Sequence, residues 1–130
     1  MKIFFAIILF SFSFLSCKKE NSQLSNGTYT GIFKVIYPSG TYSGPVSISL
    51  NDSIYHCSRN SNRIPAGGSG SFSNINSKLT FKDINIWTAD FDWNLVLEGE
   101  YDFSFDGISL KLWATKNNVG YYEYSLKKEY

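Results

Sequence analysis

The 130-residue chain lacks the charge excess and the sets of metal-binding side chains that several large functional classes require. Its 12 Lys and Arg against 11 Asp and Glu leave no basic surplus for binding nucleic-acid phosphates. Two cysteines and a single histidine are too few for a Cys2His2 zinc site. Alanine is also scarce beyond residue 16, where it is confined to Ala66, Ala89 and Ala114. This scarcity argues against a helical domain, because alanine is the strongest helix former.

Aromatic side chains are abundant instead, with 11 Phe, nine Tyr and three Trp in the chain. Together with the frequent Ser, Thr, Ile and Val, they favour β-strands over helices. The length of the chain corresponds to one domain at most. We therefore expect a single small all-β domain.

The first 16 residues have the layout of a secretory signal. Lys2 supplies a positive charge, and residues 3–15 are apolar apart from Ser11 and Ser13. This apolar run is too short to cross the roughly 30 Å hydrocarbon core as a permanent helix. We expect residues 1–16 to be a signal peptide that is removed after export.

The end of this segment resembles the lipobox of bacterial lipoproteins. Phe14-Leu15-Ser16-Cys17 places a small serine directly before a cysteine, although a lipobox usually has leucine where Phe14 stands and a small residue where Leu15 stands. The resemblance implies cleavage before Cys17 and lipidation of this residue with diacylglyceryl and further acyl chains such as palmitate. Lys18 stands where such proteins carry aspartate when they are retained in the inner membrane. The resemblance therefore implies an outer-membrane location, with the lipid as the attachment.

Residues 17–26 are polar and turn-rich, and we expect them to tether a domain that spans 27–130. The alternative is an ordinary signal peptide followed by an incidental cysteine. If Cys17 carries lipid, Cys57 has no disulfide partner, and we expect it to be a buried, inert thiol. His56 precedes it directly, but neighbouring side chains on a strand point to opposite faces. No catalytic dyad is expected there.

Alternation of apolar and polar residues is the main pattern along the domain. A loop rich in glycine occupies residues 60–70, and we expect residues 84–93 to form a long connection that packs its own aromatic side chains. The expected strands are 29–37, 41–50, 53–58, 71–75, 78–83, 94–105, 108–114 and 121–128.

These segments predict an antiparallel up-and-down barrel of about eight strands, with a β-sandwich as the alternative. No segment between the expected strands has the periodicity of a helix, so consecutive strands are expected to pair as hairpins. Closure into a barrel would remove exposed strand edges. The interior of an eight-stranded barrel is either filled by side chains or holds one small ligand.

The domain is similar to the calycin group of barrels, which includes the lipocalins. Those barrels begin with Gly-x-Trp on the first strand and end with a basic residue that packs over the tryptophan. Here Gly27-Thr28-Tyr29 occupies the first position, with Tyr29 in place of tryptophan, and Lys128 is placed to supply the second. The chain also resembles small lipocalin-like lipoproteins of Gram-negative bacteria. This resemblance implies the fold and a ligand pocket, and it implies no catalytic residues.

The segment from Trp87 to Trp93 is the most distinctive candidate site. Asp90 and Asp92 lie among its aromatic residues, a combination that suits stacking on a sugar ring and hydrogen bonding to its hydroxyls. With Asp83 they offer a Ca²⁺ site as an alternative, although the EF-hand spacing is absent. The structural alternative is a corner in which the tryptophans pack and the aspartates cap backbone amides. The residues expected to line a ligand site are Trp87, Asp90, Asp92, Trp93, Tyr101 and Tyr122.

Apart from the Ca²⁺ alternative above, no pattern of residues predicts an enzyme or a cofactor. The stretch 67–70 (Gly-Gly-Ser-Gly) lacks the Lys-Ser/Thr ending of a phosphate-binding loop. Two functions remain for a lipid-anchored barrel. It could carry a small apolar or amphipathic ligand. Alternatively, it could be a structural or interaction lipoprotein that meets an envelope protein through the loops 60–70 and 87–93.

Overall fold

The computed structural model describes residues 23–116 and 118–130, so the expected signal peptide and Cys17 lie outside the described residues. The described chain is almost entirely β-structure, in accordance with its aromatic and β-branched composition. A short 3-10 helix, η1 (Trp93–Leu95), precedes the sixth strand. The strands are β1 (Gly27–Tyr37), β2 (Gly40–Asn51), β3 (Ile54–Cys57), β4 (Gly68–Ile75), β5 (Lys78–Asp83), β6 (Gly99–Phe105), β7 (Ser109–Lys116) and β8 (Gly120–Lys128).

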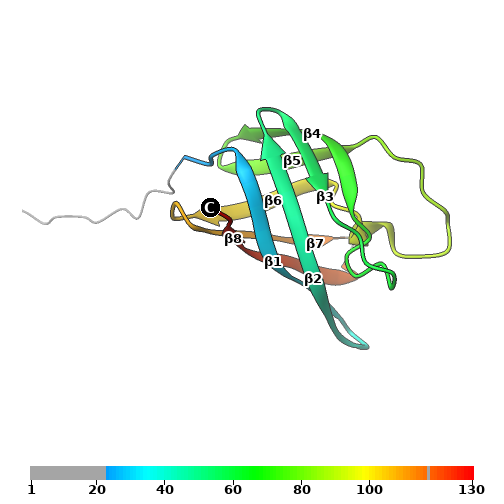
Figure 1. Ribbon diagram of the computed structural model, residues 1–130. Helices are drawn as coiled ribbons and strands as arrows, with labels where there is room; N and C mark the ends of the chain where they lie inside the picture. The colour runs from blue at the N-terminus through cyan, green and yellow to red at the C-terminus, as the bar shows by residue number, and fades with distance from the viewer. Residues whose placement is uncertain (1–22, 117) are drawn as a thin grey trace, which may run out of the picture.

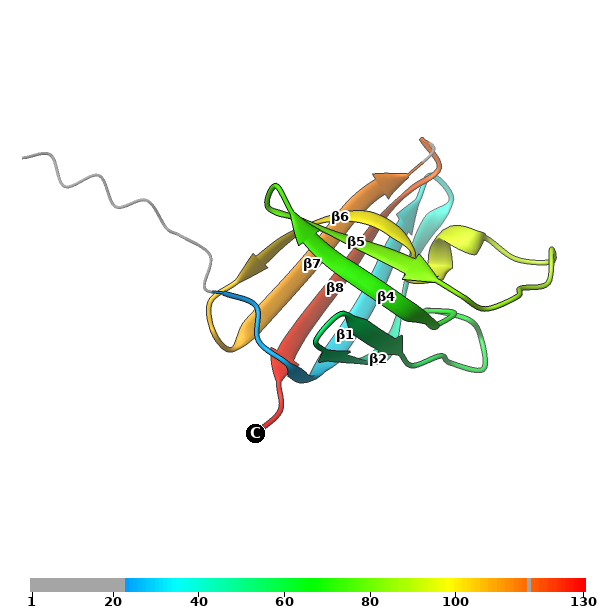
Figure 2. The same cartoon turned by 90° about the horizontal axis from the view of Figure 1, so that it is seen from above.

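The eight strands form a closed antiparallel barrel in which each strand pairs with its neighbour in sequence (Figure 1). The barrel closes where β8 pairs with β1 from Tyr29↔Lys128 to Ile36↔Tyr121. Viewed from above, the strands wrap around a common interior (Figure 2). The up-and-down barrel predicted from the sequence is therefore confirmed, and the sandwich alternative is wrong.

The expected strand over 94–105 is wrong in its first part. Asp92 accepts a hydrogen bond from the Asn94 amide and begins η1, so the regular strand starts only at Gly99. The fourth strand begins earlier than expected, at Gly68, inside the predicted loop. Gly70 is required there because a Cβ on it would lie 2.0 Å from the Lys82 carbonyl oxygen.

Apolar and aromatic side chains fill the barrel, and tyrosines are prominent among them. Tyr29, Tyr55, Tyr101, Tyr122 and Tyr124 are at most 1 % exposed. Their rings contact other aromatic rings edge to face, as in the pairs Tyr55–Phe81 at 5.0 Å and Tyr101–Tyr124 at 5.9 Å between centroids. The interior that could have held a ligand is thus occupied by the side chains of the strands themselves.

Cys57 faces this interior and His56 faces solvent, as the alternation predicted. Burial raises the pKa of the Cys57 thiol well above its usual range. The thiol therefore stays protonated at neutral pH and behaves as a small apolar group.

Both chain ends of the domain lie at the same end of the barrel, which we call the terminal end (Figure 1). Ser25 closes it, because the Tyr29 hydroxyl donates to the Ser25 carbonyl oxygen at 2.6 Å and Lys128 Nζ donates to Ser25 Oγ at 2.8 Å. The aliphatic part of Lys128 covers Gly27, where a Cβ would lie 2.8 Å from Lys128 Cε. Residues 24–26 of the expected tether are thus packed on the barrel, with Leu24 against its core.

The opposite end, the loop end, carries the long connections 58–67 and 84–98 (Figures 1 and 2). The second connection crosses this end and closes it. The Leu97 amide donates to the Gly67 carbonyl at 2.8 Å, and the Ala66 amide donates to the Leu95 carbonyl at 2.9 Å. Leu95, Val96 and Leu97 are buried. The described chain therefore closes the barrel at both ends.

The buried tyrosines differ in hydrogen bonding, and this difference predicts their contributions to stability. Tyr55 donates to the Leu97 carbonyl at 2.6 Å, whereas among the described residues the Tyr124 hydroxyl has no partner of good geometry. Y55F should lower the free energy of unfolding by about 1–3 kcal/mol, because it leaves a buried carbonyl unpaired. Y124F should change it by less than about 1 kcal/mol. Urea unfolding of both variants checks this, and an equal loss in the two would contradict it.

Candidate functional site

The two tryptophans of the 84–98 connection lie in different environments. Trp87 is partly buried, donates from Nε1 to Asp83 Oδ2 at 2.6 Å and contacts Phe91 edge to face. Trp93 is 58 % exposed, although its Nε1 donates to the Thr88 carbonyl at 2.8 Å. Trp87 therefore helps to hold the connection in place, and Trp93 presents its ring to solvent.

Asp83 and Asp90 hold the connection together. Asp83 accepts hydrogen bonds from the Ser69 amide and the Asn85 side chain as well as from Trp87. Asp90 accepts from the Thr88 hydroxyl and pairs with Arg63 at 2.8 Å. These two contacts lower the pKa of Asp90 to about 2. Among the described residues, no group of three His, Cys, Asp or Glu side chains is placed to hold a metal ion.

Asp92 ties the connection to the rim of the barrel. Its Oδ2 accepts from the Tyr37 hydroxyl at 2.5 Å and from the Tyr122 hydroxyl at 2.6 Å, while its Oδ1 accepts from the Asn94 amide. Burial alone would raise the pKa of Asp92, but these hydrogen bonds outweigh it and lower the pKa below its usual value. Burial and the nearby carboxylate raise the pKa of both tyrosines. The cluster is therefore a carboxylate bound by two neutral hydroxyls at neutral pH.

Lys116 lies beside this cluster at the end of β7. Its Nζ donates to the Glu98 carbonyl at 2.5 Å and lies over the rings of Tyr101 at 4.4 Å and Tyr122 at 5.8 Å. Burial lowers the pKa of Lys116 to about 8, against the opposing effect of the Glu98 and Asp92 carboxylates. Lys116 therefore links the end of β7 to the 84–98 connection.

Three large apolar side chains of the connection are exposed. Ile84 is 76 % exposed, Ile86 is 100 % exposed, and Trp93 is exposed as described above. We call these three residues the apolar crest. Exposed large apolar side chains on one connection make it a candidate contact surface.

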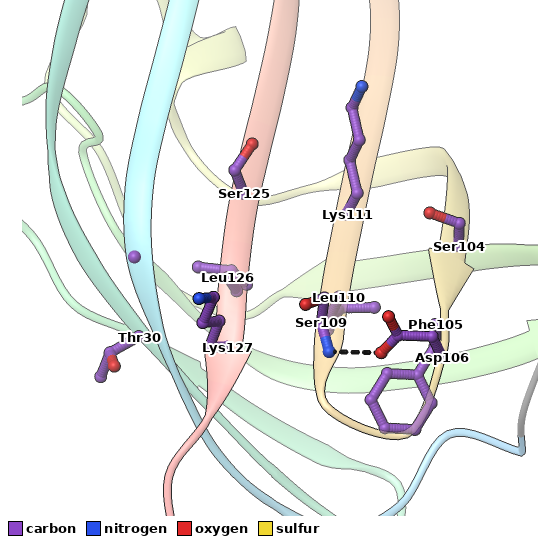
Figure 3. A pocket seen from close by; sticks show the side chains of 11 residues that line it. Thr30, Ser104, Phe105, Asp106, Ser109, Leu110, Lys111, Ser125, Leu126 and Lys127 are labelled. Atoms are coloured by element: carbon purple, nitrogen blue, oxygen red, sulfur yellow. Dashed lines mark hydrogen bonds between the residues drawn. The ribbon is translucent and has the colours of Figure 1, made fainter.

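A groove lies on the side of the barrel and is lined by residues of β1, β6, β7 and β8 (Figure 3). This flank groove of about 590 Å³ combines apolar side chains with four hydroxyl side chains and the lysines Lys111 and Lys127. Asp106 at one end accepts a hydrogen bond from the Ser109 amide at 2.7 Å and thereby fixes the β6–β7 turn.

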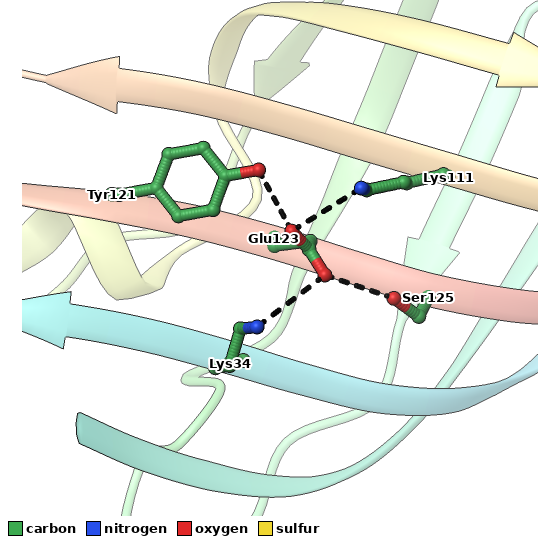
Figure 4. A network of polar contacts seen from close by, with 5 residues as sticks. All are labelled: Lys34, Lys111, Tyr121, Glu123 and Ser125. Atoms are coloured by element: carbon green, nitrogen blue, oxygen red, sulfur yellow. Dashed lines mark hydrogen bonds and ion pairs between the residues drawn. The ribbon is translucent and has the colours of Figure 1, made fainter.

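Next to the flank groove, Glu123 organises the outer face of the same strands (Figure 4). Its carboxylate accepts from the hydroxyls of Tyr121 at 2.7 Å and Ser125 at 3.1 Å, and it lies 3.7 Å from Lys34 Nζ and 3.6 Å from Lys111 Nζ. Burial would raise the pKa of Glu123, but these hydroxyls and lysines lower it. The network cross-links β1, β8 and β7 and gives no sign of a reactive group.

The structure brings together only some of the residues expected to line a ligand site. Asp92 and Tyr122 are in contact, and Lys116 connects Tyr122 to Tyr101. The other three have different partners: Trp87 donates to Asp83, Asp90 pairs with Arg63, and Trp93 donates to the Thr88 carbonyl.

Sequence reasoning missed Tyr37, Lys116, Arg59 and Arg63 as residues of the loop end. Tyr37 shares the parity of the inward face of β1, so alternation could have placed it at the rim. The two arginines had no comparable pattern, because they lie in the irregular connection 58–67.

Comparison with protein-family models, with characterised proteins and with solved structures finds no match for this chain. The site is therefore interpreted from its own geometry.

The position of Lys116 predicts how stability changes in mild alkali. The folded protein releases the Lys116 proton near pH 8, whereas the unfolded chain holds it to about pH 10.4. Below pH 8 the desolvation cost of Lys116 is fully present, and between pH 8 and 9.5 it should be relieved by on the order of 1–2 kcal/mol. The buried Cys57 thiol and the buried tyrosines act in the opposite direction in alkali, because their pKa values are raised, so Lys116 is isolated by comparison with K116M. Urea unfolding at pH 7 and 9.5 should show wild type and K127M gaining on the order of 1–2 kcal/mol relative to K116M, and the same pH dependence in all three proteins would contradict the assignment.

Proposed function

We propose that the protein is an outer-membrane lipoprotein whose barrel serves as an interaction module, with the loop end as the contact surface. The observation that carries this proposal is a filled barrel that nevertheless exposes the apolar crest of Ile84, Ile86 and Trp93. Exposing such side chains is unfavourable in water, by about 25 cal/mol for each Å² of apolar surface that could otherwise be buried. A partner that covers them would recover this free energy.

The arrangement of the two barrel ends supports the same function. Residues 23–26 lead into β1 at the terminal end, so a lipid on Cys17 would hold that end towards the membrane. The loop end, with the crest, then points away from the membrane surface. A lipid anchor through several acyl chains is stable, since each buried CH₂ contributes about 0.8 kcal/mol.

A carrier of small apolar ligands receives less support. Eight-stranded barrels that carry a ligand hold it in the interior. Here the large side chains of Tyr29, Phe33, Tyr101 and Tyr124 occupy that space, each with no exposed surface. The lipocalin-like barrel is thus best suited to serve as a rigid support for its loops.

Replacing Cys17 with serine tests the anchor. C17S should leave the barrel folded, because the described core does not include residue 17, and should move the protein from the membrane fraction to the soluble fraction. Fractionation of cells producing either form, with circular dichroism of the released protein, measures both effects. A C17S protein that stays in the membrane fraction would show that the anchor lies elsewhere.

Site-specific photo-crosslinking tests the contact surface in intact cells. A photoreactive phenylalanine analogue at Ile86 should give a discrete adduct with one envelope protein. The matched control is Ile75, which is 63 % exposed but lies in the β4–β5 hairpin at the terminal end. Adding W93S should reduce the Ile86 adduct. The same adducts at both positions, or none at Ile86, would contradict the proposed surface.

A further inference from the structure

The loop end also contains a groove, which shares Ile86 with the crest and whose other lining residues indicate a chemical class of ligand. This loop groove of about 510 Å³ lies between the connections 58–67 and 84–98. Its volume falls within the range of small-molecule sites, roughly 300–1,000 Å³. The connection 58–67 contributes Arg59 and Arg63 to its lining, and the connection 84–98 contributes Trp87 and Phe91.

The walls of the loop groove are held in place by contacts that do not depend on a ligand. Arg63 links the two connections, because its guanidinium pairs with Asp90 and lies 4.6 Å over the centroid of Phe91. Asn60 fixes the first wall by donating from Nδ2 to the Ile64 carbonyl at 2.5 Å and to the Pro45 carbonyl at 2.9 Å. A site formed in advance binds with a smaller loss of conformational entropy.

The unpaired charge of the groove is that of Arg59, since Asp90 pairs with Arg63 and Asp83 is hydrogen-bonded to Asn85 and Trp87. Among residues 23–116 and 118–130, the exposed Arg59 has neither an ion pair nor a hydrogen bond, while Arg63 shares its charge with Asp90. Of the described residues that line the groove, none is an aspartate or a glutamate. A free guanidinium presents donors in a planar fork that matches a carboxylate.

The remaining lining combines aromatic and neutral polar groups. Trp87 provides ring surface against which the C–H face of a sugar can pack, while Arg63 covers the ring of Phe91. The Asn85 amide and the Thr88 hydroxyl donate to Asp83 and Asp90, which leaves their oxygens as acceptors. An acidic peptide would match the arginines but would not require this aromatic wall. The combination favours a ligand that presents a carboxylate, hydroxyls and an apolar face together.

We propose that the loop groove binds an acidic saccharide, with Arg59 pairing with a sugar carboxylate and Trp87 packing against a ring. This inference rests on the proposed function, in that it takes the loop end as the contact surface. It adds a ligand class and a site that meets the apolar crest at Ile86. Arg59 is the best residue to test, because its side chain makes no contact that the fold needs.

The test is calorimetric titration of the full chain in detergent with trigalacturonic acid, at physiological salt. Such salt screens the attraction between exposed charges beyond about 8 Å. R59A should weaken binding roughly tenfold or more, the loss expected for a charge-assisted hydrogen bond, and R59K should weaken it less. K127A, which removes an exposed lysine of the flank groove, should leave binding unchanged. Neutral maltotriose and the peptide triglutamate should bind much more weakly.

The inference is overturned if trigalacturonate does not bind at millimolar concentration, or if R59A and K127A weaken it equally. Equal binding of maltotriose removes the role of the carboxylate, and tighter binding of triglutamate replaces the saccharide with an acidic peptide. The outcome is separable from that of the crosslinking. An Ile86 adduct without saccharide binding leaves the proposed function intact and removes this inference, whereas saccharide binding without an adduct removes the protein partner only.

Discussion

The pairing of β8 with β1 is the constraint on which the rest of this structure depends. It turns eight short strands into a closed sheet, so that each strand is hydrogen-bonded on both sides over part of its length. Gly31 permits it, because a Cβ at this position would lie 1.9 Å from the Ser125 carbonyl oxygen on β8. Closure also creates a small interior that the inward-facing side chains must fill.

Tyrosine fills that interior, which brings hydroxyl groups into an apolar space. The structure accommodates several of them at the two ends of the barrel, where polar partners are available. Tyr29 reaches Ser25 at the terminal end, while Tyr55 reaches Leu97 and Tyr122 reaches Asp92 at the loop end. Each of these bonds attaches a non-strand segment to the barrel. The same tyrosines therefore fill the core and hold the segments that close its ends.

This arrangement explains why the loop end can serve as a surface. The connection 84–98 is fastened from inside by buried Leu95, Val96 and Leu97, by Asp92 and by the carbonyl that accepts from Lys116. These contacts hold the connection in place, so Ile86 and Trp93 stay exposed although burying them would be favourable. A barrel that carries fixed loops at one end, and the proposed lipid anchor at the other, is suited to the proposed recognition at a distance from the membrane.

The sequence by itself determined the strand alternation, the class of fold and the inward positions of Tyr29, Phe33, Val35, Leu110 and Leu112, because side chains on a strand alternate between faces regardless of what the chain meets later. It also determined that Cys57 and His56 face opposite ways.

Only the tertiary structure decided which residues the 84–98 connection contacts. The tyrosine partners of Asp92 are 55 and 30 residues away in the chain, and Arg63 meets Asp90 across 27 residues, so no local pattern encodes these contacts. They arise because barrel closure places the ends of β1, β7 and β8 beside the irregular loops. For the same reason, whether the barrel is filled depended on how its side chains pack together, which strand periodicity does not specify.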